Sequence, residues 1–155
     1  MKIGLISDTH DNLVNIEKAV EIFNERGVEF VLHAGDYVAP FSLAPMFKLK
    51  SEWTGVLGNC DGEKRGLLKK SENRIKRGQL SLDIDNKKVV VIHSLDEYNK
   101  EPADIVVFGH THKPETNRVE DILFVNPGEC SGWLTKRATI GILETVDLGV
   151  DIIEL

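Results

Sequence analysis

Apolar runs that end in metal-ligand residue types are the feature that most limits what this chain can fold into. Five such runs occur, and together they deliver four of the five histidines. Short, uniformly apolar runs are typical of strands buried on both faces of a parallel sheet. Ligands of such sheets bind beyond the carboxyl ends of the strands. The polar residues that end the runs are therefore expected to meet at one edge, and they are Asp8, His10, Asp36, Asn59, His93, His110 and His112.

The first part of the chain has the pattern of a β-α-β unit. Lys2 to Ser7 predicts a buried strand, and Asn12 predicts the N-cap of a helix that ends at Gly27. Val28 to Leu32 predicts the second strand, so a parallel pair with a right-handed crossover follows. Further strands are expected at Trp53 to Leu57, Leu80 to Ile84, Val89 to Ile92 and Ile105 to Phe108, with a short helix at Phe41 to Phe47 and a solvated basic helix face at Leu67 to Arg77.

After His112 the pattern changes to short strands separated by tight turns. These strands are expected at Thr116 to Val119, Ile122 to Val125, Ala138 to Glu144 and Val150 to Ile153. The N-terminal part is thus α/β and the C-terminal part mostly antiparallel β. No linker or repeat separates them, so residues 1–155 are expected to form a single domain around a shared core.

Composition narrows the classes of partner. A net charge of -6 disfavours a stable complex with nucleic acid, because that role needs a basic face. The two cysteines, Cys60 and Cys130, do not form a CxxC motif, so free thiols in a reducing cytoplasm are expected. Neither a signal peptide nor a membrane-spanning run is expected from the sequence. Small anionic substrates that bind through metal ions remain compatible with this composition.

The ligand types indicate a centre with two divalent metal ions. Two carboxylates, four imidazoles and one amide suit two ions that share one bridging carboxylate. Nitrogen and oxygen ligands without thiolate favour Mn, Fe, Ni, Co or Zn over Ca or Mg. An Asp-x-His or His-x-His spacing places both side chains on one side of an extended segment. Asp8 with His10, and His110 with His112, are therefore each expected to reach one point.

The motifs, taken in order, resemble those of the calcineurin-like metallophosphoesterase superfamily and its small YfcE-like prokaryotic phosphodiesterase branch. They are Asp8-x-His10, Gly35-Asp36, Gly58-Asn59-x-Asp61, His93 and Gly109-His110-x-His112. The resemblance extends from residue 1 to about Gly128. It implies the metallophosphatase fold, an α/β/β/α sandwich of two mixed sheets flanked by helices.

The resemblance also implies roles for these residues. Asp8, His10, Asp36 and His112 would hold one metal, and Asp36, Asn59, His93 and His110 would hold the other. Asp36 would bridge the two ions, manganese being the expected metal. A hydroxide between the ions would attack the phosphorus of a small phosphodiester. The implied catalytic residues are Asp36, Asn59, His110 and Asp61.

Two positions depart from the superfamily pattern. Cys60 follows Asn59, where many members have a histidine that binds phosphate or protonates the leaving group. Either Asp61 or metal activation then takes that role, or the leaving group must be a good one; Cys60 as a packed small residue is the alternative. Ser94 follows His93, where glycine is common, and is expected to narrow the pocket without affecting ligation.

Other polar and aromatic residues have simpler interpretations. His33 is interpreted as a core histidine or a support for a ligand rather than a ligand itself. Asp11 and Asn12 are candidates for substrate contact, but helix capping explains Asn12 more simply. Lys113 is expected to be solvated, and Trp53 and Trp133 to lie in the core or at an interface.

The function expected from the resemblance is a metal-dependent phosphodiesterase. A phosphomonoesterase and a protein-binding scaffold like the retromer subunit of the same fold are the alternatives, although such scaffolds typically lack part of the ligand set. A metallo-β-lactamase pattern would continue to Asp-His, whereas His112 is followed by Lys113 and Pro114. The first β-α turn lacks the glycine fingerprint of a Rossmann domain. A homodimer suits a domain of this size.

Overall fold

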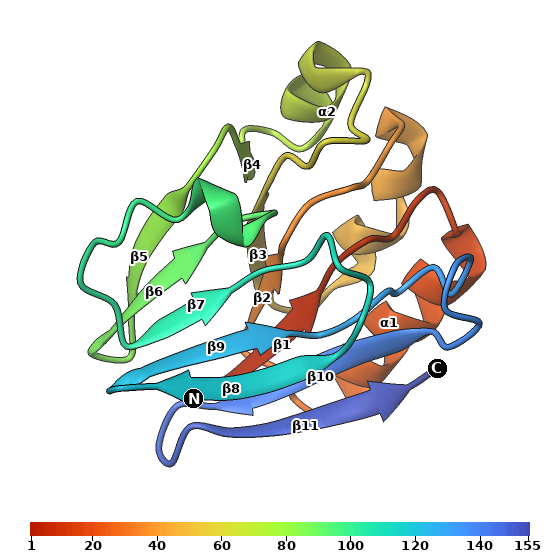
Figure 1. Ribbon diagram of the computed structural model, residues 1–155. Coiled ribbons are helices and arrows are strands. Elements are labelled where there is room, and N and C mark those ends of the chain that lie inside the picture. The colour runs from red at the N-terminus through yellow and green to blue at the C-terminus, as the bar shows by residue number, and fades with distance from the viewer.

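The computed structural model describes residues 1–155 as two mixed β-sheets stacked face to face (Figure 1). The strands of the first sheet, in spatial order, are β11 (Gly149–Glu154), β10 (Thr139–Glu144), β1 (Lys2–Ile6), β2 (Phe30–His33), β3 (Glu52–Val56) and β4 (Ile75–Lys76). Those of the second sheet are β5 (Leu80–Ile84), β6 (Lys87–Val91), β7 (Ile105–Val107), β9 (Ile122–Asn126) and β8 (Glu115–Val119).

Parallel strands occupy the middle of both sheets. In the first sheet β1, β2, β3 and β4 run parallel, and β10 pairs antiparallel with β1. In the second sheet β6, β7 and β9 run parallel, and β5 and β8 are antiparallel edge strands. The expected pair of mixed sheets is confirmed.

The helix α1 (Leu13–Glu25) covers the outer face of the first sheet (Figure 1). Asn12 caps it as predicted, and its side chain accepts a hydrogen bond from the backbone amide of Asn15 at 3.3 Å. The buried face of α1 repeats at helical spacing through Ile16, Val20 and Phe23. Phe23 packs directly over Gly4 of β1, where an added Cβ would come within 2.9 Å of the phenyl ring.

The core between the sheets comes from alternate residues of the strands. Ile3 and Leu5 of β1 face the second sheet, while Ile6 packs in the cluster on the α1 side. Val89 and Val91 of β6 fill the same inter-sheet layer. The outer face of the second sheet is covered by Tyr98 and Ala103, which follow the 3-10 helix η3 (Leu95–Glu97).

Two expected helices differ from the structure. The segment Phe41 to Phe47 forms two 3-10 helices, η1 (Pro40–Leu43) and η2 (Pro45–Lys48), because Pro45 has no backbone N–H to continue a single helix. The expected basic helix face at Leu67 to Arg77 is wrong beyond Lys70. Helix α2 (Lys64–Lys70) ends there, Glu72 and Asn73 take left-handed φ values of 54° and 64°, and β4 follows.

The other predicted strands lie within two residues of their expected bounds. Asp85 and Asn86 join β5 to β6 with φ values of 51° and 60°, the left-handed pair that a tight hairpin requires. β8 with β9, and β10 with β11, form the antiparallel hairpins of the C-terminal part. No helix has the length and apolar character needed to cross a membrane.

Phe23→Ala tests the packing of α1 on the first sheet. The side chain is 1% exposed, so its loss should lower the free energy of unfolding by about 3–5 kcal/mol. Val14→Ala is the matched control on the same helix, since Val14 is 64% exposed and its truncation should change stability by less than about 0.5 kcal/mol. Urea unfolding measures both, and equal effects of the two variants would contradict the packing described.

Candidate metal centre

The seven predicted ligand residues lie beyond the carboxyl ends of parallel strands drawn from both sheets. Loops after β1, β2 and β3 carry the residues of the first sheet, and loops after β6 and β7 carry those of the second. The residues from the first sheet are Asp8, His10, Asp36 and Asn59, and those from the second are His93, His110 and His112.

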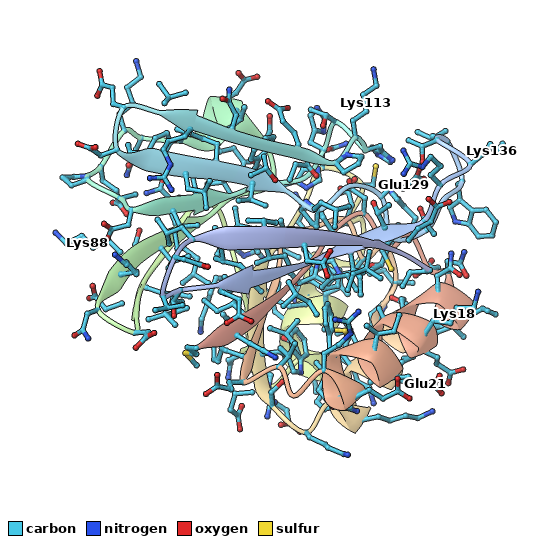
Figure 2. The ribbon with its side chains drawn as sticks, turned by 90° about the horizontal axis from the view of Figure 1, so that it is seen from below. Lys18, Glu21, Lys88, Lys113, Glu129 and Lys136 are labelled. Carbon is cyan, nitrogen blue, oxygen red and sulfur yellow. The ribbon has the colours of Figure 1, made fainter.

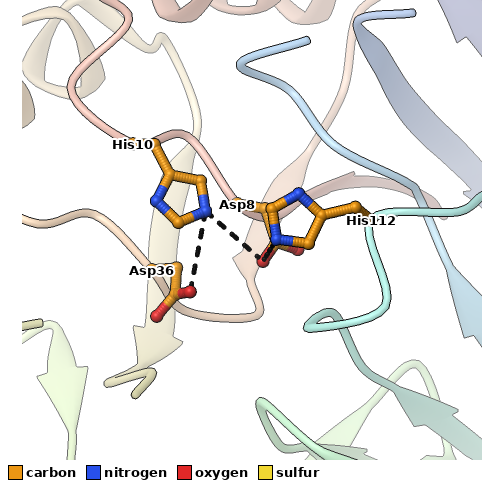
Figure 3. A group of neighbouring side chains, drawn as sticks. All are labelled: Asp8, His10, Asp36 and His112. Atoms are coloured by element: carbon orange, nitrogen blue, oxygen red, sulfur yellow. Dashed lines mark ion pairs between the residues drawn. The ribbon is translucent and has the colours of Figure 1, made fainter. Parts of the chain in front are cut away.

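Four of these side chains form one compact cluster, drawn in Figure 3. Asp8, His10, Asp36 and His112 each offer one ligand atom, and these atoms all lie within 4.8 Å of one another. His10 Nε2 is 3.6 Å from Asp36 Oδ2 and 3.9 Å from Asp8 Oδ1. His112 Nε2 is 3.5 Å from Asp8 Oδ1.

The other three side chains form a second group that also lies next to Asp36. Asn59 Oδ1 lies 2.8 Å from His93 Nε2 and 2.9 Å from His110 Nδ1. His93 Nε2 is also 3.5 Å from Asp36 Oδ2, the same oxygen that faces His10. Asp36 therefore stands between the two groups.

Unpartnered polar atoms show that the first cluster fits a cation. Asp8 Oδ1 and His10 Nε2 are buried and have no hydrogen-bond partner. A buried polar atom left in this state destabilises a fold unless a ligand or ion satisfies it. Burial raises the pKa of Asp8, against the hydrogen bond from Ser7 and the nearby imidazoles of His93 and His112. A divalent ion held by nitrogen and oxygen atoms would satisfy these groups.

The donor and acceptor roles in the second group also indicate that a cation fits there. His93 Nδ1 lies 2.8 Å from the carbonyl oxygen of Ala34, which only accepts, so Nδ1 carries the proton. In the neutral ring Nε2 then carries a lone pair, and this nitrogen faces the side-chain oxygens of Asn59 and Asp36. Three electron-rich atoms facing one another also fit a cation.

The ligand loops do not have the extended backbone that the sequence spacing suggested. Asp8, His10 and Asp36 have φ values of 52°, 37° and 61°, and His110 and His112 have values of 66° and 63°. These values lie in the left-handed region, which few residues other than glycine adopt. The expectation that Asp-x-His and His-x-His pairs converge by strand alternation is therefore wrong, although the side chains of each pair do lie near the same centre.

Contacts between neighbouring loops hold this backbone. The amide of Asp8 donates to Gly35 O and that of His10 to Asp36 O, both at 3.0 Å. Glycine is required at Gly58 and Gly109, where an added Cβ would collide with the Asp36 carboxylate and the Ser7 hydroxyl respectively.

Asp61 holds the loop after β3 and is poorly placed for proton transfer. It is 1% exposed, and its two carboxylate oxygens accept the backbone amides of Val38 and Gly58, each at 2.7 Å. Burial raises the pKa of Asp61, while these hydrogen bonds act in the opposite direction. The geometry therefore does not favour Asp61 as the proton donor that the sequence suggested.

Cys60 lies exposed beside the centre. Its backbone amide donates to Asp36 Oδ1 at 2.8 Å. Partial burial, together with the nearby carboxylates of Asp36, Asp61 and Asp8, raises the pKa of the thiol to about 11. The thiol therefore stays neutral near pH 7.

His33 lies in the core, as expected. Its Nδ1 accepts the backbone amide of Gly35 at 3.1 Å, and its Nε2 lies 3.2 Å from the Thr9 hydroxyl. The ring also stacks on Tyr37. Burial lowers the pKa of His33 well below its usual value, so the neutral ring supports the loops after β1 and β2.

Five further residues that the sequence singled out can now be placed. Asn12 caps α1 and donates to Ser131 O at 2.8 Å, while Asp11 accepts the amide of Ala39. Lys113 is exposed and extends away from the fold (Figure 2). Trp53 is buried, but Trp133 is 55% exposed and does not belong to the core.

Glu129 is a site residue that the sequence reasoning missed. It is fully buried, and its Oε1 lies 3.3 Å from Nδ1 of His112, an atom without a hydrogen bond. Such a carboxylate favours the proton on Nδ1 and leaves Nε2 free to face Asp8. Burial alone would raise the pKa of Glu129, but hydrogen bonds from Leu134, Thr135 and Ser131 lower it to about 2. The only sequence signal was an acidic residue directly after Pro127-Gly128.

The stacked mixed sheets and the buried carboxylate and imidazole cluster define the class of metal-dependent phosphoesterases. The family model described as the calcineurin-like phosphoesterase superfamily domain matches residues 1–148. The chain belongs to this superfamily of hydrolytic enzymes, in its small YfcE-like prokaryotic branch.

Known relatives agree with this assignment. Phosphodiesterase MJ0936 of Methanocaldococcus jannaschii is 43% identical over 155 residues, which cover 94% of this chain and 93% of the relative. Phosphodiesterase YfcE of Escherichia coli K12 is 27% identical over 148 residues, covering 84% of this chain and 80% of the relative. The solved structure of an archaeal phosphodiesterase superposes with a TM-score of 0.92 at 40% identity and covers 100% of both chains.

Glu129→Gln tests the contact between this carboxylate and His112. We expect the affinity for Mn²⁺ to fall by roughly 10- to 100-fold, because the His112 imidazole loses the carboxylate that keeps its proton on Nδ1. Isothermal titration with Mn²⁺ measures the change. Glu120→Gln is the control, since Glu120 is exposed in the turn between β8 and β9. Unchanged affinity in a folded Glu129→Gln variant would contradict the proposed orientation of His112.

Proposed function

We propose that the chain is a dinuclear metal-dependent phosphodiesterase that hydrolyses small phosphodiesters. The observation that carries the proposal is the position of Asp36. Its buried Oδ2 lies 3.6 Å from His10 Nε2 of one group and 3.5 Å from His93 Nε2 of the other. One carboxylate oxygen that faces two ligand groups supports a bridging role.

The proposed division of ligands follows the two groups. Asp8, His10, Asp36 and His112 would hold one ion, and Asp36, Asn59, His93 and His110 would hold the other. The nitrogen and oxygen donors suit Mn²⁺ best, with Ni, Fe, Co or Zn as alternatives. Two bound ions would lower the pKa of a shared water to about 7 and neutralise the phosphoryl oxygens.

The chain's own contacts orient these ligands. Asp8 Oδ2 accepts the Ser7 hydroxyl at 2.6 Å and the backbone amide of His110 at 3.2 Å, which leaves Oδ1 facing the cluster. Asp36 Oδ1 is likewise engaged by the amide of Cys60, so Oδ2 is the atom directed at both groups. Groups held in this way need little rearrangement when charge develops on a substrate.

The open side of the centre indicates where a substrate would approach. Asn59, Cys60 and His110 are exposed, whereas Asp8 and Asp36 lie beneath them in the fold. Cys60 keeps its proton near pH 7, and both oxygens of Asp61 are engaged. This favours diesters whose leaving group departs with little help from a protein acid.

The names of the relatives support a diester as the substrate. The proteins from Methanocaldococcus jannaschii and Escherichia coli are both described as phosphodiesterases. A phosphomonoesterase, which would use the same metal-assisted hydrolysis, remains the alternative. A protein-binding scaffold is less well supported, because every member of the predicted ligand set is present. The unpaired thiols of Cys60 and Cys130 suit a cytoplasmic location.

An activity screen over a metal titration tests the function. We expect Mn²⁺-loaded protein to hydrolyse bis(p-nitrophenyl) phosphate with a higher kcat/KM than p-nitrophenyl phosphate. The opposite order would favour the phosphomonoesterase. Folded protein that binds two ions yet hydrolyses neither ester would favour the scaffold.

Asp36→Ala tests the bridge. Because both groups lose a ligand, we expect the metal content, measured by inductively coupled plasma mass spectrometry, to fall by at least one ion per chain. We expect kcat to fall by about 10³-fold or more, as several kcal/mol of transition-state stabilisation are lost. Asp83→Ala is the control on the exposed side of β5. Full activity of the Asp36→Ala variant would refute the bridging role.

Cys60→His tests how the leaving group departs. An imidazole is a better acid than a thiol with a pKa of about 11, so the variant should gain most with poor leaving groups. The dependence of kcat on leaving-group pKa, measured over a series of aryl methyl phosphates, should therefore become shallower. Metal content should not change; loss of an ion would show that residue 60 affects the ligands instead.

A further inference from the structure

A small cavity opens directly beside the first ligand cluster. Its volume is about 270 Å³, and its walls are formed by His10, Cys60, His112, Glu129, Trp133 and Leu134. Pockets for drug-sized ligands typically occupy roughly 300–1,000 Å³, so this one suits a single ring system. The cavity shares two imidazoles with the proposed metal centre, so a group bound in it would lie next to a phosphoryl group bound there.

Trp133 forms one wall of the cavity and is held in place by a ligand residue. Its indole Nε1 donates to the carbonyl oxygen of His10 at 3.1 Å. The side chain is nevertheless 55% exposed, although tryptophan usually buries most of its large apolar ring. An exposed indole fixed at the edge of a polar centre provides a flat surface on which another ring can stack.

Leu134 extends this apolar wall, and hydrogen bonds to Glu129 hold the loop that carries it. Leu134 is 73% exposed, so packing within the fold does not explain an apolar residue there. Glu129 accepts the backbone amides of Leu134 and Thr135 at 3.0 Å and 2.9 Å, which fixes the loop conformation. A preorganised loop loses little entropy when a ligand binds.

The charges around the cavity favour an apolar group over a charged one. The Glu129 carboxylate is occupied by the amides of Leu134 and Thr135 and by the hydroxyls of Ser131 and Thr135. Apart from Cys60 and the two imidazoles shared with the proposed metal centre, the rest of the wall is the indole of Trp133 and the isobutyl group of Leu134. These two groups suit a flat apolar ring better than a sugar or a phosphate.

We propose that Trp133 and Leu134 form a subsite for a planar aromatic substituent of the substrate, a nucleobase or an aryl ring that stacks on the indole. This proposal rests on the proposed function for the position of the phosphoryl group at the metal centre. It adds a substrate class, phosphate esters that carry an aromatic ring, to the reaction.

The test compares two phosphate ligands that differ only in the base. Isothermal titration of the Mn²⁺-loaded protein measures Kd for adenosine 5′-phosphate and for ribose 5-phosphate. We expect the base to tighten binding by roughly 5- to 150-fold, the range given by stacking of one base on an aromatic side chain. Trp133→Leu should reduce the ratio of the two Kd values to within about twofold of one.

Two further variants separate stacking from general apolar contact. Trp133→Phe keeps an aromatic ring and should retain most of the preference for the base. Val146→Ala is the control, since Val146 is an 84% exposed apolar residue between β10 and β11, at the opposite end of the first sheet from the centre. Half-exposed and exposed positions such as these tolerate substitution without unfolding.

Equal affinities for the two ligands, no binding of adenosine 5′-phosphate, or a full preference retained by Trp133→Leu would each overturn the subsite. Failure of the proposed function has a different signature. Protein that hydrolyses no phosphate ester would refute the reaction, while the ratio of the two Kd values would still report on the aromatic subsite.

Discussion

The positions of the proposed ligands Asp8 and His10 depend on backbone hydrogen bonds that cross from one strand-end loop to the next. The amides of Asp8 and His10 donate to the loop after β2, and the amide of Cys130 donates to Ser7 O. These bonds hold ligand residues in left-handed conformations that an isolated loop would leave readily. Asp36 can face both ligand groups only because the loops on either side of it are fixed in this way.

The sequence predicted the strands and the ligand types because buried parallel strands have a simple apolar pattern. It could also place the ligands at one edge, since parallel strands end on the same side. It could not predict how Asp8 and His10 converge, because φ angles in these loops depend on contacts with Gly35 and Asp36. Strand alternation predicted that the side chains of Asp8 and His10 converge. They do, but through left-handed φ angles rather than through an extended strand.

Long-range contacts explain the remaining differences. Glu129 resembles any surface glutamate in sequence, and only the return of its loop against His112 makes it part of the site. Trp133 is a large apolar residue of the kind that usually packs in a core, yet its hydrogen bond to His10 O holds it at the surface. The basic helix also ends early because β4 pairs with β3, a tertiary contact. Only the division of the expected helix at residues 41–47 by Pro45 follows from local chain chemistry.

The candidate metal centre lies where loops from the two sheets meet, which gives it a role in the stability of the fold as well. Asp8 and His110 are 102 positions apart, and their loops meet through a hydrogen bond at the cluster. An ion bound by residues of both sheets would act as a reversible cross-link between them. A ligand at 100 times its Kd stabilises the folded state by about 2.7 kcal/mol. The melting temperature of such a protein would then rise and fall with the free metal concentration around it.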